Sequence, residues 1–239
     1  MHKYANPARF GALADRILPW ARWVMILALI PGLWLALVAS PPDYQQGESV
    51  RIMYLHVPAA WMSMFTYMVM AGAAFTALVW RHPLAQLAGR AAAPIGATFT
   101  ALALVTGSLW GKPMWGTFWV WDGRLTSVLV LFFLYLGYMA LDRAIEDEEK
   151  AGRAASILAL VGVVNIPIIK FSVDWWNTLH QPASVMRMGG STIDGSMLTP
   201  LFIMALAFQA YFVWIFLIRM KLEIDRRKAA VMRQSLRGI

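Results

Sequence analysis

The stretch LTSVLVLFFLYLGYMAL, residues 125–141, contains no charged side chain and lies between Arg124 and Asp142. A transmembrane α-helix needs about 20 predominantly apolar residues to cross the hydrocarbon core of a bilayer. Every backbone polar group within that core has to be hydrogen-bonded internally, and the alternation of polar and apolar residues typical of barrel strands is absent here. Residues 125–141 are therefore predicted to form a transmembrane helix.

Five further stretches have the same apolar character, and together they predict the fold class. They cover approximately residues 20–39, 57–80, 93–110, 154–171 and 199–218. Asn165 and Pro167 predict a kink in the fifth of the six spans. We predict an all-α integral membrane protein, a six-transmembrane-helix bundle with short interfacial helices in the outward-facing loops. It is expected to form a single membrane domain over residues 1–239.

The composition excludes several other classes of protein. Of the 239 residues, 59% are hydrophobic and 14% are charged, which is typical of membrane proteins rather than soluble domains. Cysteine is absent, which excludes disulfides, thiolate metal sites, thiol catalysis and the Cys-x-x-Cys-His motif of c-type cytochromes. The net charge of +8 does not indicate a nucleic-acid partner, because the basic residues are not gathered in a folded soluble domain.

The distribution of basic residues indicates the topology. An even number of spans places both termini on one side, and that side carries most of the Lys and Arg residues. The opposite face carries only Arg51, Lys112, Arg124, Lys170 and Arg187. By the positive-inside rule both termini are expected to be cytoplasmic, and the remaining connections are expected to face outward. These outward connections are residues 40–56, 110–125 and 172–198.

Three features of the cytoplasmic side carry further expectations. The first span lacks a following small-residue cleavage site, so we expect a retained anchor rather than a signal peptide. The tail after Arg219 is expected to extend the last helix against anionic lipid headgroups. The acidic residues 146–149 are interpreted as a solvated helix end, with a docking patch for a soluble partner as the alternative.

A second informative stretch is WGKPMWGTFWVWD, residues 110–122, which gathers four tryptophans and a phenylalanine around one acidic residue. Tryptophan prefers the membrane–water boundary, so an aromatic belt is one interpretation. The density of the cluster, with Gly111 and Gly116 permitting close backbone approach, favours a platform for a large, flat aromatic ligand. If the run is helical, most of these rings share one stripe and form an aromatic shelf in the interface. The candidate platform residues are Trp110, Trp115, Phe118, Trp119, Trp121 and Asp122.

Asp122 has three possible roles in this run. It can cap the following helix, pair with Arg124 or orient a ligand. Capping is the simplest expectation, because an aspartate directly before a helix accepts hydrogen bonds from the first unpaired backbone N–H groups.

Two histidines are predicted on the outward face. His56 begins the second span and His180 lies just outside the fifth, whereas His2 is in the N-terminal tail and His82 in a cytoplasmic connection. Neutral imidazole is a good ligand for haem iron, and two imidazoles fill both axial positions. The alternative for each histidine is a capping or hydrogen-bonding role.

A porphyrin is a flat π-system that would suit the tryptophan platform, and it also carries two carboxylates. Outward basic residues can meet those carboxylates through charge-assisted hydrogen bonds, the alternative being contact with lipid headgroups. The candidates are Arg51, Lys112, Arg124 and Arg187.

Signatures of common enzymes are missing, so no catalytic function is predicted. The chain contains no G-x-x-x-x-G-K-[ST] phosphate loop, no His-Glu-x-x-His and no Gly-x-Ser-x-Gly. If the protein takes part in ATP-driven work, a partner has to supply the ATPase. The buried row of carboxylates expected of a proton-coupled transporter is also missing from the spans.

The segment WGTFWVWD, residues 115–122, resembles the tryptophan-rich WWD signature of membrane haem-handling proteins. The surrounding sequence is similar to one family of this group, cytochrome c maturation protein C, also called haem exporter protein C. The similar segments are PDYQQG at 42–47, YLHVPAA at 54–60, residues 107–122 and WWNTLHQ at 175–181. Two departures are Phe118, where related sequences often have Trp, and Gly123, where Ala is common.

The resemblance implies a non-enzymatic haem-binding and haem-delivery protein of c-type cytochrome biogenesis in the bacterial inner membrane. In that family two axial histidines hold haem b at the periplasmic face, and by motif position these are His56 and His180. Residues 110–125 would then be the platform loop. Haem passes to a periplasmic haem chaperone, cytochrome c maturation protein E. The implied ABC-type complex also contains an ATPase, a second membrane protein and a small membrane protein, which are cytochrome c maturation proteins A, B and D respectively.

Two other function classes are alternatives. A cytochrome c synthase of the wider WWD group would attach haem to apocytochrome. Such proteins are larger and carry an additional histidine pair within the membrane, which the predicted positions of His2 and His82 do not provide. A permease for a small solute would need polar groups in mid-span, and the spans offer few.

Overall fold

The computed structural model describes residues 6–182, 184–185 and 189–237. Six helical segments of this described chain are long and apolar enough to cross a membrane, which confirms the predicted all-α membrane bundle. The elements in chain order are α1 (Pro7–Trp34), the π-helical turn η1 (Leu35–Ala39), the 3₁₀ turn η2 (Glu48–Ile52), α2 (Met53–Trp80), α3 (Ala85–Trp115), α4 (Gly123–Ala144), α5 (Glu148–Gly162), α6 (Asn165–Trp175) and α7 (Gly195–Arg237).

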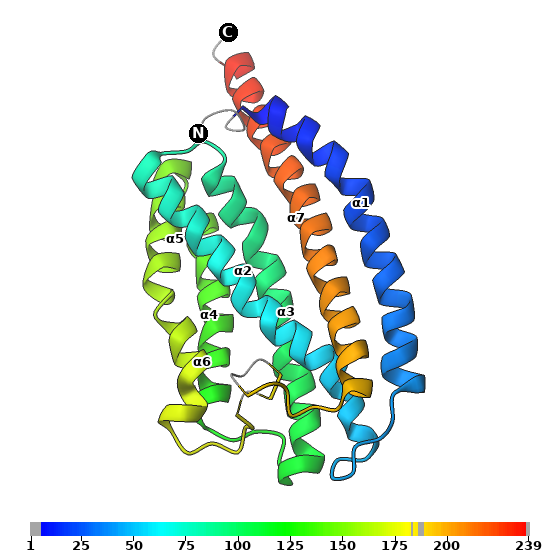
Figure 1. The fold of residues 1–239 in the computed structure, drawn as a ribbon. Coiled ribbons are helices and arrows are strands. Elements are labelled where there is room, and N and C mark those ends of the chain that lie inside the picture. Colours follow the sequence, from blue (N-terminus) through cyan, green and yellow to red (C-terminus); the bar gives the residue numbers. More distant parts are fainter. Residues whose placement is uncertain (1–5, 183, 186–188, 238–239) are drawn as a thin grey trace.

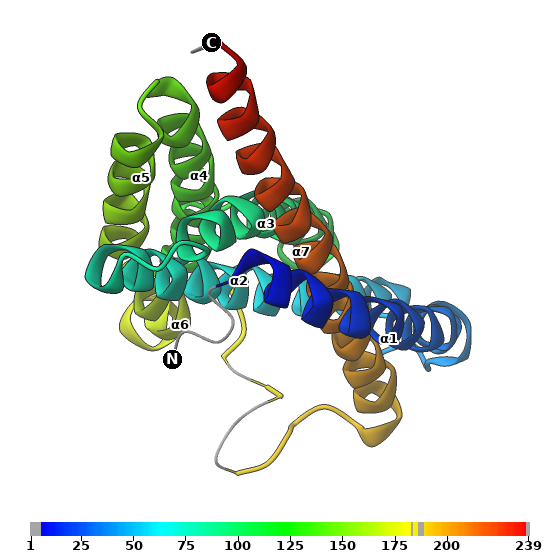
Figure 2. The same cartoon turned by 90° about the horizontal axis from the view of Figure 1, so that it is seen from above.

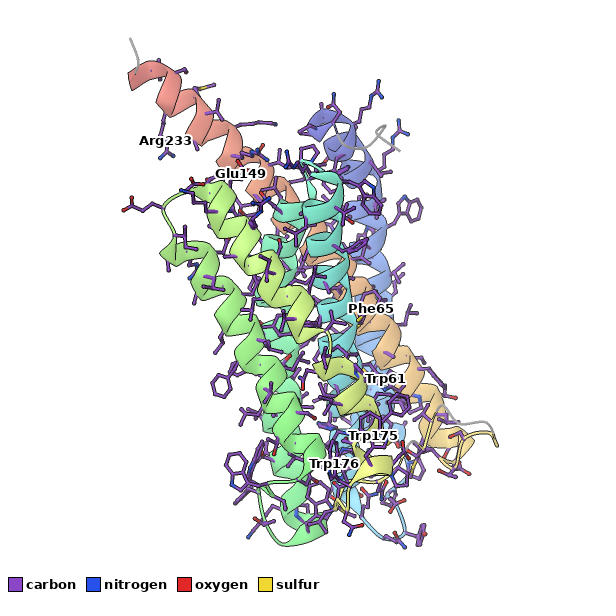
Figure 3. The ribbon with its side chains drawn as sticks, turned by 90° about the vertical axis from the view of Figure 1, so that its left-hand side faces the viewer. Trp61, Phe65, Glu149, Trp175, Trp176 and Arg233 are labelled. Atoms are coloured by element: carbon purple, nitrogen blue, oxygen red, sulfur yellow. The ribbon has the colours of Figure 1, made fainter. Side chains whose placement is uncertain are left out.

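The bundle has two ends with different contents. At one end α1 begins and α7 ends, and we call it the terminal end (Figure 1). At the other end α2 begins and α6 ends (Figure 1), and we call it the histidine end because His56 and His180 lie there, beside the last residues of α3. Figure 3 shows Glu149 and Arg233 at the terminal end, with Trp175 and Trp176 at the histidine end.

The helices α2 and α3 form the middle of the bundle, with the α1–α7 pair on one side and α4, α5 and α6 on the other (Figure 2). In a bilayer the hydrophobic effect does not drive helices together, because lipid tails are as apolar as the side chains. Helices associate instead through close packing, which small residues at the interface allow. Gly96 of α3 lies under Tyr135 of α4, so closely that a Cβ would be 2.1 Å from the ring carbon Cζ. The Tyr135 hydroxyl donates to Ser63 O of α2 at 2.8 Å, which joins three helices at one point.

The peripheral helix α1 packs mainly against α7. Ala14, Ala21 and Ala28 recur every seven residues on α1, and all three are buried. Further along the same helix, a Cβ on Gly32 would be 2.9 Å from Met204 Sδ of α7. A seam of small residues therefore holds a helix whose remaining surface is largely exposed and apolar, as a lipid-facing helix requires.

The fifth span is broken, as predicted. Its two pieces, α5 and α6, are separated at Val163 and Val164, whose N–H groups bond to carbonyls only three residues back. Pro167 has no N–H to continue an α-helical ladder across this point. Asn165 Nδ2 donates to Ser127 O of α4 at 2.9 Å, which fixes the break against its neighbour.

The last helix is longer than a membrane requires. With 43 residues, α7 spans about 64 Å at 1.5 Å per residue, roughly twice the hydrocarbon thickness of a bilayer. The basic residues after Arg219 continue this helix, which confirms the predicted extension. On the same end of the bundle Asp147 caps α5, accepting from the N–H groups of Glu149 and Lys150 at 3.0 Å each. This cap agrees with the interpretation of the acidic residues 146–149 as a helix end.

Candidate functional site

The histidine end is assembled from four segments: the connection before α2, the first turns of α2, the stretch joining α3 to α4, and the chain following α6. Asp43 shapes the first segment, because its Oδ1 accepts from the backbone N–H groups of Gln45 (2.9 Å) and Gln46 (2.8 Å). Gly47 follows with φ of 56°, a left-handed conformation that favours glycine. The turn presents Gln46 Oε1, which accepts from Trp110 Nε1 at 2.9 Å.

His56 lies near the start of α2 and is held by α3. Its Nδ1 is 3.0 Å from Ala103 O and 3.1 Å from Thr106 Oγ1. A Cβ on Gly107 would be 2.8 Å from His56 Cε1, so the ring occupies the space that this glycine leaves free. The ring of Trp110 meets the imidazole edge-on, with ring centroids 5.7 Å apart.

These contacts determine the tautomer of the His56 ring. A carbonyl oxygen only accepts hydrogen bonds, so Nδ1 must carry the proton that it donates toward Ala103 O. In the neutral imidazole Nε2 is then the nitrogen with a free lone pair. The hydrogen-bonding role that the sequence left open therefore uses Nδ1 and leaves Nε2 available for a ligand bond.

His180 is placed by the chain that follows α6. Its backbone N–H donates to Thr178 Oγ1 at 3.1 Å, and its Nδ1 is 3.1 Å from Gln181 O. The same argument leaves Nε2 as its free nitrogen. The Trp115 ring lies beside the imidazole, with centroids 6.2 Å apart. Burial, and after it the positive charge of Arg124, lower the pKa of His180 from its ordinary value, so the neutral ring is favoured.

The tryptophan run is helical only as far as Trp115, which corrects the expectation that the whole run forms one helix. The helix α3 continues to Trp115 and ends at Gly116, which has φ of 76° and donates its N–H to Lys112 O at 3.0 Å. Residues 117–122 are irregular, so Trp115, Phe118, Trp119 and Asp122 do not share one helical stripe. The physical reason is that a glycine in the left-handed conformation ends the helix. At Gly111 the close approach is made by Trp115 itself: a Cβ there would be 2.9 Å from Trp115 Cε3.

The aromatic residues of the run divide into two groups. Trp110 and Trp115 of α3 touch the two histidines, as described above. The indole of Trp119 meets Trp121 edge-on at 5.4 Å, and its Nε1 is buried with no hydrogen-bond acceptor among the described residues. Trp121 is 76% exposed and Phe118 is 53% exposed. The structure thus brings two of the predicted platform residues to the histidines and leaves two at the surface.

Asp122 caps α4, which confirms the simplest expectation for it. Its Oδ1 accepts from the N–H of Leu125 at 2.7 Å, and its Oδ2 accepts from the Thr178 hydroxyl. Because Thr178 in turn receives the His180 N–H, Asp122 links the start of α4 to the segment that carries His180. Arg124 donates from Nε to Ser172 Oγ of α6 at 2.8 Å, and its charge acts on both His56 and His180.

Two of the other predicted basic contacts, Arg51 and Lys112, bond to groups outside this cluster. Arg51 forms an ion pair with Glu48 and donates from Nη1 to Ala36 O at 3.1 Å, so it holds η1. The Lys112 ammonium donates to Gly116 O at 2.9 Å and lies 5.2 Å from the centroid of the exposed Phe118 ring. Arg187, also a candidate contact, lies outside the described residues.

Sequence reasoning missed the polar residues that hold the predicted ones. These are Gln46, Thr106, Ser172 and Thr178, which bond to Trp110, His56, Arg124 and Asp122 respectively. Thr178 had a local signal, since a threonine two residues before a histidine can accept its N–H in a turn. The other three bond to residues on another element distant in the sequence, and nothing in the linear sequence marks such pairs.

The chain was compared with known proteins. A family model described as "Heme exporter protein C" matches residues 1–235. A "Heme exporter protein C" of Bradyrhizobium diazoefficiens is 62% identical over 224 residues, covering 94% of this chain and 85% of that protein. The protein of the same name in Escherichia coli strain K12 is 54% identical over 84% of this chain and 81% of its own length. A "Putative cytochrome c biosynthesis ccmC-like mitochondrial protein" of Marchantia polymorpha is 54% identical over 74% of each chain.

The family model covers nearly the whole chain, and these relatives share more than half of the aligned residues. The multi-pass bundle and the histidine end are therefore features of a protein that belongs to the heme exporter protein C family.

Proposed function

We propose that this protein binds haem b at its histidine end and delivers it for c-type cytochrome biogenesis, without catalysing a reaction itself. The observation that carries the proposal is that His56 and His180, far apart in the sequence, lie close enough for the charge of His180 to act on His56. Each imidazole lies against a tryptophan of α3 and donates from Nδ1 to a carbonyl oxygen. Hydrogen bonds of this kind fix the tautomer and orientation of a metal-ligating histidine.

The surroundings of the two histidines suit a porphyrin. Indole rings offer a flat apolar surface, and the buried Trp119 Nε1 is a donor that an acceptor on the ligand would satisfy. Arg124 lies close enough to influence both imidazoles and is the basic residue best placed for a propionate. The role of the stretch 110–125 as a haem platform is part of this proposal, with Trp110, Trp115 and Trp119 as its inner residues.

The proposal includes an orientation and partners. With both termini in the cytoplasm by the positive-inside rule, the histidine end faces the periplasm of a bacterial inner membrane. Haem would pass there to a periplasmic haem chaperone, cytochrome c maturation protein E. The name of these relatives, heme exporter, supports membership of an ABC-type system. Its other members would be an ATPase, a second membrane protein and a small membrane protein, cytochrome c maturation proteins A, B and D.

The test is the absorption spectrum of the detergent-purified protein supplied with haem b, oxidised and reduced. The wild type is expected to give a low-spin spectrum, which two imidazole ligands produce. His56→Ala and His180→Ala should each depart from it. His82→Ala is the control, because His82 lies in the turn between α2 and α3 at the terminal end. Unchanged spectra in both ligand variants would refute the assignment.

A further inference from the structure

The two histidines are held in different ways. His56 belongs to a membrane-spanning helix, and its ring nitrogen bonds to a second such helix, at Ala103 O and Thr106 Oγ1. Thr106 is itself buried and donates to Leu102 O at 2.6 Å, so its hydroxyl oxygen is oriented to accept from His56. The ring also fills the space over Gly107. Moving His56 would require α2 and α3 to separate.

His180 has no comparable support from a helix among the described residues. Its ring nitrogen bonds to Gln181 O, the carbonyl of the next residue, and its backbone bonds to Thr178, two residues earlier. Among the described residues, the hydrogen-bonded link from this segment to a helix runs through the Thr178 hydroxyl to Asp122, the cap of α4, and the Trp115 ring of α3 lies beside the imidazole. Releasing the Thr178 bond would loosen the His180 segment without breaking a contact between two membrane-spanning helices.

This inference rests on the proposed function. We propose that His56 is the retained axial ligand of haem and His180 the exchangeable one, with Thr106 and Thr178 as their positioning residues. Delivery begins when the dative Fe–Nε2 bond to His180 breaks and its electron pair returns to the imidazole. An imidazole nitrogen of the acceptor then donates its lone pair to the iron at the position that His180 has left. The exchange transfers no electron and no proton, and His56 is released last.

The proposal predicts that the two ligand variants differ in haem content. After identical purification, His180→Ala retains haem on His56 and shows a high-spin spectrum, because one axial imidazole is missing. His56→Ala loses most of its haem, because the remaining ligand has only local support. Thermal unfolding of the haem-free proteins, followed by intrinsic fluorescence, shows whether both variants are folded before their haem content is compared.

The positioning residues give a second measurement that does not remove a ligand. Thr106→Val and Thr178→Val have nearly the same volume as threonine and delete one hydroxyl each. Thr106→Val should lower haem affinity about tenfold, the usual effect of losing a partner of a metal-ligating histidine. Thr178→Val should keep the haem content and speed haem transfer to apomyoglobin, which offers an imidazole, by about the same factor. Thr106→Ser and Thr178→Ser restore a hydroxyl and should behave like the wild type.

The outcomes separate the two proposals. Equal haem loss in His56→Ala and His180→Ala overturns the inequality of the ligands but leaves the proposed function standing. Greater loss in His180→Ala reverses the assignment and also overturns it. Low-spin wild-type spectra in both histidine variants would overturn the ligand assignment itself, and with it both proposals.

Discussion

At the scale of single residues, Trp119 has a buried polar group that a ligand would satisfy. Its indole N–H is buried without an acceptor among the described residues, although buried polar groups are nearly always paired. A buried N–H without a partner costs about 1–3 kcal/mol, which a haem oxygen atom would recover on binding. Trp80 provides the comparison, because it is 54% exposed at the terminal end of α2 and lies far from the histidines.

We predict that Trp119→Ala lowers the haem content of the purified protein more than Trp80→Ala does. Trp119→Phe should fall between the two, since it keeps an aromatic ring and loses only the N–H donor. The measurement is the haem-to-protein ratio after reconstitution with a limiting supply of haem b. Equal ratios in Trp119→Ala and Trp80→Ala would count against a platform at this position.

At the scale of helices, the site depends on where two of them end. Gly116 ends α3 in a left-handed conformation, and Asp122 begins α4 by capping it. Between these points the chain cannot follow a helix, so its rings point in several directions rather than along one stripe. The cap does more than stabilise α4, because the second carboxylate oxygen of Asp122 holds Thr178 and, through it, the segment of His180.

We predict that Asp122→Ala lowers stability and speeds haem transfer to apomyoglobin, as Thr178→Val does. Loss of an N-cap costs about 1 kcal/mol, and the Thr178 hydroxyl loses its partner at the same time. The matched control is Asp147→Ala, which removes a cap of the same kind from α5 at the opposite end of the bundle. The rate of haem transfer and thermal unfolding are measured for both, and equal transfer rates in the two variants would refute a role for Asp122 at the site.

At the scale of the whole molecule, the arrangement of six crossings separates two chemically different ends. The terminal end carries the long basic extension of α7 and the capped acidic turn before α5. The histidine end carries the tryptophans, both outward histidines and the Asp43 turn. If the positive-inside rule holds for this chain, only the histidine end is accessible from the periplasm.

The absence of cysteine from the sequence allows this orientation to be tested directly. Tyr44→Cys, at a side chain that is 90% exposed in the Asp43 turn, should react with a membrane-impermeant maleimide in intact cells. Glu149→Cys, exposed near the start of α5, should react only after the inner membrane is opened. The reverse pattern would place the histidine end in the cytoplasm and remove the basis for delivery to a periplasmic acceptor.

Several properties of this protein follow from its sequence alone. The six spans, a kink in the fifth span near Asn165 and Pro167, the helical basic tail and the cap at Asp122 were all predicted, and the structure confirms them, with the fifth span interrupted at Val163 and Val164. These features depend on local causes: apolar length against bilayer thickness, the missing N–H of proline, and a carboxylate next to the first turn of a helix. Family membership follows from the motif segments in the same way.

Only the tertiary structure decided how the site is held together. The sequence did not show that Ala103 O and Thr106 fix the tautomer of His56, or that Gln46 receives the Trp110 N–H. It also suggested a helical shelf where Gly116 in fact ends α3. The physical reason is that these hydrogen bonds join residues distant in the sequence, from α2, α3 and the Asp43 turn, so they depend on how those segments pack together, which no local pattern of residues encodes.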